Sequence, residues 1–275
     1  MLKSRIITAV ILLSLLLLVL LALPDAWWTG LVVLVVMQGT LEWSKLSKIS
    51  GRNAYIYGTL TLAIMLTIVW FDAGHSDVEQ TLPHLLIYAV AALFWLIIVP
   101  TWLIVGWKVE NPLLMCLAGW SVLIPTGLAM LDLYALSPLI LLFLMCLVWV
   151  ADIGAYFAGR RFGKNKLAPS ISPGKTWEGV AGAVLGATIY VLLIWNISAY
   201  ADHRGVLPVL LLASWWWVGL AVIGDLFESA IKRQAGVKDS GALLPGHGGL
   251  LDRIDALTST LPLAALVILL QQIGQ

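Results

Sequence analysis

The sequence predicts an all-α, polytopic membrane protein with about nine transmembrane helices. Three observations support this prediction. The mean hydropathy is +0.97 and only 11% of the residues are charged, a composition typical of proteins whose solvent is lipid. Nine apolar segments reach or approach the roughly 20 residues with which an α-helix crosses a bilayer. Finally, basic residues gather in alternate loops.

The nine apolar segments follow one another with short polar connections and without a separate soluble part. Aromatic residues, which favour the headgroup region, mark several of their ends: Trp27 lies at the start of the second, Trp70 ends the third, and Trp107 and Tyr200 follow the fourth and the seventh. The approximate ranges are 6–23, 26–41, 54–71, 84–105, 112–131, 135–158, 177–199, 206–227 and 255–272.

The first segment resembles the apolar part of a secretion signal, because Lys3 and Arg5 precede it. It is followed by Pro24, Asp25 and two tryptophans rather than by the small residues of a cleavage site. We therefore expect this segment to be a retained helix.

The charged loops predict the orientation. If the N-terminus is cytoplasmic, nine spans place all of the 16 Lys and Arg residues except Arg204 on the inner side, in agreement with the positive-inside rule. With one span more or fewer, the Lys and Arg residues would be spread over both sides of the membrane. The C-terminus is then expected on the opposite side, and the longest inner loops are 159–176 and 228–254.

The stretch GDLFESAIKR, residues 224–233, follows the inner end of the eighth span. At about 100° per residue, Asp225, Ser229, Lys232 and Arg233 lie within roughly 100° of one another on one helix face. A carboxylate and a hydroxyl can hold a hard divalent ion, while the cations bind phosphate oxygens. The alternative is a juxtamembrane helix end with an internal ion pair and snorkelling side chains.

The stretch GHGGLLDRID, residues 246–255, combines a glycine-rich turn around His247 with two acids. The glycines allow loop N–H groups to point at an anion, and Asp252 and Asp255 share a helix face. The two acids could simply favour the positive end of a helix. Together with Asp225, however, three carboxylates border one inner loop near four cations, an arrangement that suits magnesium and a nucleoside triphosphate.

The third charged stretch, residues 151–179, contains GKT but not a P-loop, because the pattern requires glycine where Pro169 stands and no strand precedes it. It offers Asp152 near the inner end of the sixth span, Lys175 in a Pro-Gly turn, and the basic residues Arg160, Arg161, Lys164 and Lys166. Attraction to anionic lipid is an equally good explanation for those four basic residues.

The remaining ionisable residues have no catalytic pattern. Outside the three stretches the histidines are well separated and lack ligand spacing, and the outer acids are expected to form a solvated face; these residues are His75, His84, His203, Asp72, Asp77 and Glu79. The formal net charge of +1 gives no indication of a nucleic-acid partner.

Residues 229–255 resemble the signature of the phosphatidate cytidylyltransferases, or CDP-diacylglycerol synthases, and residues 151–179 are similar to that family as well. The resemblance is strong over about residues 148–260. One departure is Ala256, where members of the family often carry serine. The matching residues are Ser229, Lys232, Arg233, Lys238, Asp239, Gly241, Leu244, Pro245, His247, Gly248, Gly249, Asp252, Arg253 and Asp255.

This resemblance implies that CTP and phosphatidic acid react to CDP-diacylglycerol and pyrophosphate in the presence of Mg²⁺, with a second metal ion left open. It implies metal ligands at Asp225, Asp252 and Asp255, with Ser229 as an additional ligand and Asp239 as a weaker candidate. It implies phosphate contacts for Lys232, Arg233, Lys238 and Arg253, and for the turn formed by His247, Gly248 and Gly249. Lys175 and Arg160 are lower-ranked anion partners.

We therefore expect a single integral membrane domain, 1–275, in the bacterial cytoplasmic membrane, with the active site facing the cytoplasm. Residues 1–134 would form scaffold or lipid-facing helices, and residues 135–275 the catalytic half. The expected partners are CTP, phosphatidic acid and membrane lipids, with a homodimer left open. The alternatives are a CTP-dependent lipid kinase and an ion or anion transporter; the latter would place its charges near the middle of spans.

Overall fold

The structure, a computed structural model, describes residues 2–197, 205–243, 246 and 248–274. Each of the nine apolar segments coincides with a helix over most of its described residues, so the all-α prediction is confirmed. The helices are α1 (Leu2–Leu21), α2 (Asp25–Leu46), α3 (Gly51–Gly74), α4 (Asp77–Leu93), α5 (Val99–Val105), α6 (Pro112–Leu136), α7 (Pro138–Phe162), α8 (Trp177–Ile197), α9 (Leu207–Ala235) and α10 (Leu251–Ile273).

Seven helical segments in the described part of the chain are long and apolar enough to cross a membrane. One of them is continuous from Val78 to Val105, because a π-helical turn, η1 (Phe94–Ile98), joins α4 to α5. Helices α1 and α2 coincide with predicted spans but are not among the seven. The chain is a helical membrane protein, whereas nine crossings and the orientation stay predictions.

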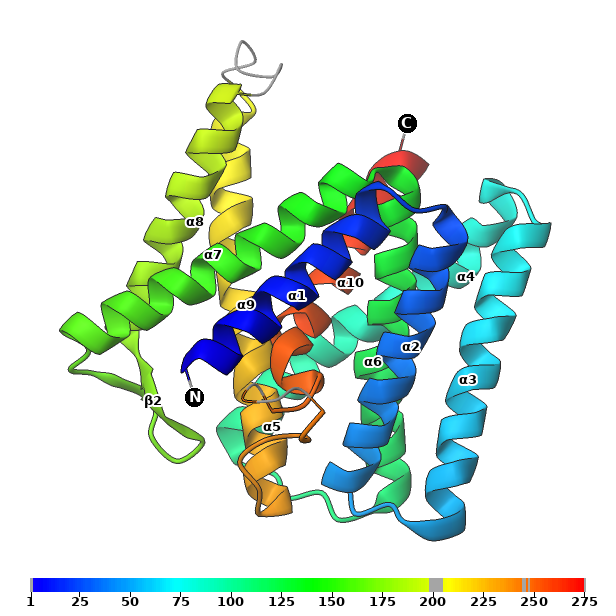
Figure 1. The fold of residues 1–275 in the computed structure, drawn as a ribbon, viewed down its shortest axis with the longest axis horizontal. Coiled ribbons are helices and arrows are strands. Elements are labelled where there is room, and N and C mark those ends of the chain that lie inside the picture. The colour runs from blue at the N-terminus through cyan, green and yellow to red at the C-terminus, as the bar shows by residue number, and fades with distance from the viewer. Residues whose placement is uncertain (1, 198–204, 244–245, 247, 275) are drawn as a thin grey trace.

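Helix α10 lies in the middle of the bundle and packs against α9, α6 and α4 (Figure 1). Together with α6 it is the most buried of the seven apolar helices. It begins at the end of the bundle that carries a small β-hairpin and runs to the opposite end. We call these the hairpin end and the far end.

Helices α7 and α8 cross at glycines. A Cβ atom on Gly154 would lie only 2.5 Å from the carbonyl oxygen of Gly182, so any other residue at this crossing would push the helices apart. Small residues at such contacts let helices approach closely in lipid. Because Asp152 lies on α7 two residues before Gly154, this packing also fixes its place.

The loop 159–176 contains the hairpin, a feature that the sequence did not predict. Strand β1 (Lys166–Ala168) pairs antiparallel with β2 (Ser172–Thr176). The connection between the strands is tied to α9, because the Arg233 Nε donates to the carbonyl oxygen of Ile171 at 3.4 Å. As a result, Lys175 on β2 lies beside α9.

Helix α9 is held from one side by aromatic packing. The Phe227 side chain is 1% exposed, and its ring centroid lies 5.4 Å from that of Trp102, 5.5 Å from Phe94, 5.6 Å from Trp95 and 6.2 Å from Trp43. The first three contacts are edge-to-face, a geometry that stabilises aromatic pairs. Side chains two residues apart on a helix project about 200° apart. With Phe227 buried among these aromatic rings, the opposite face of α9 is turned toward the candidate active site described below.

Phe227→Ala is expected to lower the free energy of unfolding by about 3–5 kcal/mol, because it empties a filled aromatic site. Thermal unfolding of the purified protein in detergent measures this loss. Phe157→Ala is the matched control, since Phe157 on α7 is 66% exposed and its removal leaves no internal cavity. Equal losses in the two variants would contradict the assigned role of Phe227.

At the far end, a network of one buried histidine and two partly buried acids replaces the solvated face that we expected. His84 is 6% exposed; its Nε2 lies 3.0 Å from Asp72 Oδ1 and its Nδ1 lies 2.9 Å from Asp132 Oδ2. The Tyr88 hydroxyl also donates to Asp132 Oδ2, at 2.7 Å. The prediction was wrong for Asp72 because α3, α4 and α6 meet here, and only their packing brings these residues together.

Candidate active site

The predicted site residues gather where α9 and α10 meet the hairpin. At Gly224 the two helices touch: a Cβ atom there would lie 2.6 Å from the backbone oxygen of Asp255 and 2.5 Å from Ser259 Oγ. Only glycine allows this approach without displacing a helix. The contact brings Asp225, which follows Gly224, to the N-terminal turn of α10.

Four carboxylates from three helices form an acidic cluster: Asp152 on α7, Asp225 and Glu228 on α9, and Asp255 on α10. Asp255 lies close enough to the first three to interact with each of them electrostatically. Lys175 balances part of this charge, because its Nζ lies 2.6 Å from Asp225 Oδ2. Lys175 was predicted as an anion partner, and without substrate its partner is an acid.

Lys232 lies between two buried acids. Its Nζ is 2.6 Å from Glu228 Oε2 and 2.6 Å from Asp252 Oδ1, and the three side chains are only 12%, 6% and 6% exposed. The other oxygen of Glu228, Oε1, is buried and has no hydrogen-bond partner among the described residues. An unpaired buried carboxylate oxygen is costly, which suggests that a cation or a ligand uses it.

Sequence reasoning missed Glu228, although a signal was present. Glu228 stands three residues after Asp225 and four before Lys232, and both spacings place side chains on one helix face.

Asp252 anchors the loop that precedes α10. Its Oδ2 accepts hydrogen bonds from the Ser240 N–H at 2.9 Å, the Gly249 N–H at 2.8 Å and the Ser240 hydroxyl at 3.0 Å, while Oδ1 faces Lys232. Oδ1 accepts one hydrogen bond and has a second lone pair, so a metal bound at Asp252 would share Oδ1 with Lys232. Its metal role stays a prediction.

The glycine-rich turn is packed tightly around this anchor. Gly248 has φ +80°, a left-handed conformation that glycine tolerates at little cost. A Cβ atom on Gly249 would clash with the Ser240 hydroxyl and with the carboxylate of Glu42, a residue of α2. The described part of the turn is therefore fixed by its neighbours.

Gly249→Ala is expected to reduce turnover by about 10-fold or more, because small displacements at a site of this kind are amplified in the rate. The steric clash requires either the loop or Glu42 to move. Gly174→Ala serves as the control, since a Cβ atom at Gly174 meets nothing within 4 Å. Equal activity in the two variants would show that the tight fit at Gly249 is unimportant.

The other predicted residues lie around the cluster with different contacts. The Ser229 hydroxyl donates to Asp225 Oδ1 at 3.4 Å, and Arg233 binds Ile171 and Val237 backbone oxygens. Arg160 contacts Tyr156, with which it forms a 2.7 Å hydrogen bond. The side chains of Lys238, Asp239 and Arg253 are exposed, and His247 lies outside the described residues.

Comparison with known proteins extends these observations to the whole chain. Residues 3–271 match the model of the cytidylyltransferase family. The phosphatidate cytidylyltransferase of Haemophilus influenzae is 36% identical over 95% of this chain and 96% of its own length. The corresponding enzyme of Pseudomonas aeruginosa is 37% identical over 96% of each chain. That of Brucella suis is 49% identical over 43% of each chain. The acidic cluster, the buried lysine and the glycine turn therefore belong to a member of the cytidylyltransferase family.

Proposed function

We propose that this chain transfers the cytidylyl group of CTP to phosphatidic acid, giving CDP-diacylglycerol and pyrophosphate. The observation that carries the proposal is the cluster of acids and cations at the hairpin end, built on helices that are otherwise apolar. A lipid phosphate lies at headgroup depth, and the charges that meet it must stand where spans end. Similarity over nearly the whole chain to enzymes named phosphatidate cytidylyltransferase supports the same reaction.

The reaction needs positioning and charge neutralisation more than a strong base. An oxygen of the lipid phosphate attacks the α-phosphorus of CTP, the bond from that phosphorus to the bridging oxygen of the β-phosphate breaks, and pyrophosphate leaves. Both substrates are anionic, so cations close to them lower the barrier. Lys175 and Lys232 are well placed for this task, because each is held by acids at 2.6 Å and can turn to phosphate.

The donor set fits Mg²⁺, which prefers hard oxygen ligands and keeps several waters. The buried, unpaired Glu228 Oε1 is an oxygen that such a cation or its water would engage. Asp225 and Asp255 would hold the ion, and Glu228 and Asp152 would contribute negative charge around it. When bound, magnesium supplies positive charge that offsets the triphosphate and the leaving pyrophosphate. A second metal ion is a further prediction.

The proposal also places the hairpin end in the cytoplasm of a bacterial cell, in the inner membrane. CTP is a cytoplasmic metabolite, and the basic residues of the predicted inner loops favour this side. A homodimer is a separate prediction, which a mass measurement of the purified protein in detergent tests.

The deciding experiment follows CTP labelled at the α-phosphate, and in a parallel sample at the γ-phosphate, in the presence of phosphatidic acid, Mg²⁺ and the purified full chain. Label in the lipid with an equal amount of pyrophosphate supports the proposal. Label that reaches the lipid only from the γ-phosphate would instead identify a CTP-dependent lipid kinase. No transfer from either position, with folded protein and several lipid phosphates, would overturn the proposal. EDTA is expected to abolish turnover, and excess Mg²⁺ to restore it.

A further inference from the structure

Glu42 is a buried acid in the half of the chain where we predicted only scaffold or lipid-facing helices. It lies near the end of α2 and is 1% exposed. Its two oxygens accept four hydrogen bonds: from Gln38 Nε2 and the Leu250 N–H to Oε1, both at 2.9 Å, and from the Ser240 hydroxyl at 2.8 Å and the Leu251 N–H at 2.9 Å to Oε2. Three of these donors belong to the loop and helix that carry Asp252.

Glu42 first caps the N-terminal end of α10. The N-cap residue of this helix is Leu250, which has no side-chain oxygen to accept the free N–H groups of the first turn. Glu42 supplies the missing acceptor from another helix, at the end of α10 where the free N–H groups form the positive end of the helix dipole. The start of α10, and with it Asp252, is therefore held by α2.

Glu42 also holds the Ser240 side chain. Its hydroxyl lies between two carboxylates, 2.8 Å from Glu42 Oε2 and 3.0 Å from Asp252 Oδ2. A hydroxyl has one proton to donate, so the Ser240 hydroxyl shares it between the two carboxylates or gives it to one of them at a time, and its position depends on both. The resulting chain of contacts runs from Glu42 through Ser240 and Asp252 to Lys232.

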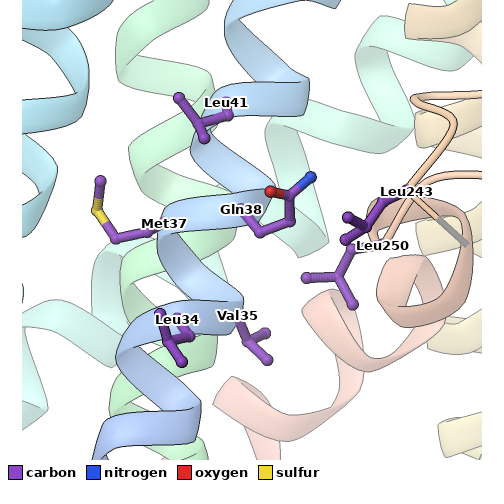
Figure 2. A pocket seen from close by; sticks show the side chains of 7 residues that line it. All are labelled: Leu34, Val35, Met37, Gln38, Leu41, Leu243 and Leu250. Atoms are coloured by element: carbon purple, nitrogen blue, oxygen red, sulfur yellow. The ribbon is translucent and has the colours of Figure 1, made fainter. Parts of the chain in front are cut away.

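Helix α2 provides a rigid base for this arrangement. Trp43, the neighbour of Glu42, donates from its indole Nε1 to the backbone oxygen of Met115 on α6 at 2.8 Å. Figure 2 shows Gln38 on the face of α2 that looks across an apolar groove to Leu243 and Leu250. From that face the Gln38 amide orients the Glu42 carboxylate toward the loop.

We propose that Glu42 is a positioning residue for cytidylyl transfer. It acts on the loop before α10, and through Ser240 and Asp252 on Lys232, without touching the reacting atoms. The N-terminal half of the chain thereby completes the active site. This inference rests on the proposed function for its kinetic consequence, while its structural part, that Glu42 holds the loop, stands independently.

The kinetic test compares Glu42→Gln and Glu42→Leu with Glu110→Gln, a matched control at an exposed loop position. Glu42→Leu is expected to lower kcat/KM for CTP by about 100-fold, the order of loss that follows a misplacement of about 1 Å. Glu42→Gln, which keeps one acceptor oxygen, should recover part of that loss. Rates are taken per folded protein, from the monodisperse fraction. Unchanged kcat and KM in the folded fraction of Glu42→Leu would overturn the proposal.

Ser240→Ala keeps the backbone contacts that cap α10 and the backbone N–H that reaches Asp252, and it removes only the hydroxyl that lies between Glu42 and Asp252. It therefore serves if the Glu42 variants fold poorly. It is expected to lower kcat by about 10-fold with little change in thermal stability; kinetics identical to the original protein would overturn the role of this hydroxyl.

Hydrogen exchange at the amides of Leu250 and Leu251 tests the structural part without substrate. Faster exchange in Glu42→Leu than in Glu110→Gln supports it, and equal exchange overturns it. If the original protein transfers no cytidylyl group, the proposed function fails while this measurement still decides whether Glu42 holds the loop.

Discussion

Replacing Asp225 by asparagine is expected to lower kcat/KM for CTP by about 100- to 1,000-fold, the range typical of losing one preorganised charged or polar group. Asparagine keeps the size of the side chain, so the packing of α9 against α10 is preserved. The substitution removes the negative charge that faces Lys175 at 2.6 Å and one of the carboxylates that suit a divalent cation.

The loss has two explanations: Asp225 binds the metal ion, or it only orients Lys175. The dependence of the rate on the Mg²⁺ concentration distinguishes them. If Asp225 holds the ion, Asp225→Asn should raise the Mg²⁺ concentration that gives half-maximal rate, whereas Lys175→Met should leave that concentration nearly unchanged. If Asp225 only orients Lys175, the two variants should behave alike and the double variant should be no worse than either. Glu110→Gln is the control for the assay, and full activity of Asp225→Asn at every Mg²⁺ concentration would rule out both roles.

Lys232→Met is expected to destabilise the protein by about 3–5 kcal/mol, because removing one partner leaves uncompensated buried charge. Glu228 and Asp252, each 6% exposed, would then face each other without the cation between them. Methionine retains most of the volume of the lysine stem, so the loss reports on charge rather than on a cavity. Turnover should fall as well, since the role that we propose for this cation is to contact the anionic substrates.

A second substitution distinguishes stability from catalysis at this position. Lys232→Met combined with Glu228→Gln removes one of the two unpaired charges and should recover part of the lost stability, as measured by thermal unfolding in detergent. It should not recover turnover. A double variant that regained activity along with stability would mean that Lys232 is a structural ion-pair partner and takes no part in the transfer.

Much of the fold was predictable because each helix corresponds to a local run of apolar residues. A run of apolar residues long enough to span a bilayer must satisfy its backbone internally, and a helix does so within the segment. All nine apolar segments accordingly lie on helices over most of their described residues. The hairpin at 166–176 was not predictable in the same way, because three- and five-residue strands in a polar loop carry little periodicity and are fixed by contacts such as that of Arg233 with Ile171.

By itself the sequence determined which residues on α9 and α10 are candidates for the chemistry, since Asp225, Lys232, Asp252 and Asp255 follow from helical spacing and from a fixed motif. The tertiary structure alone decided how these groups are paired. Glu42 is separated from Ser240 by 198 positions, and no local pattern relates residues so far apart. A buried carboxylate needs donors on every side, and those donors come from whichever elements the folding of the helices brings together.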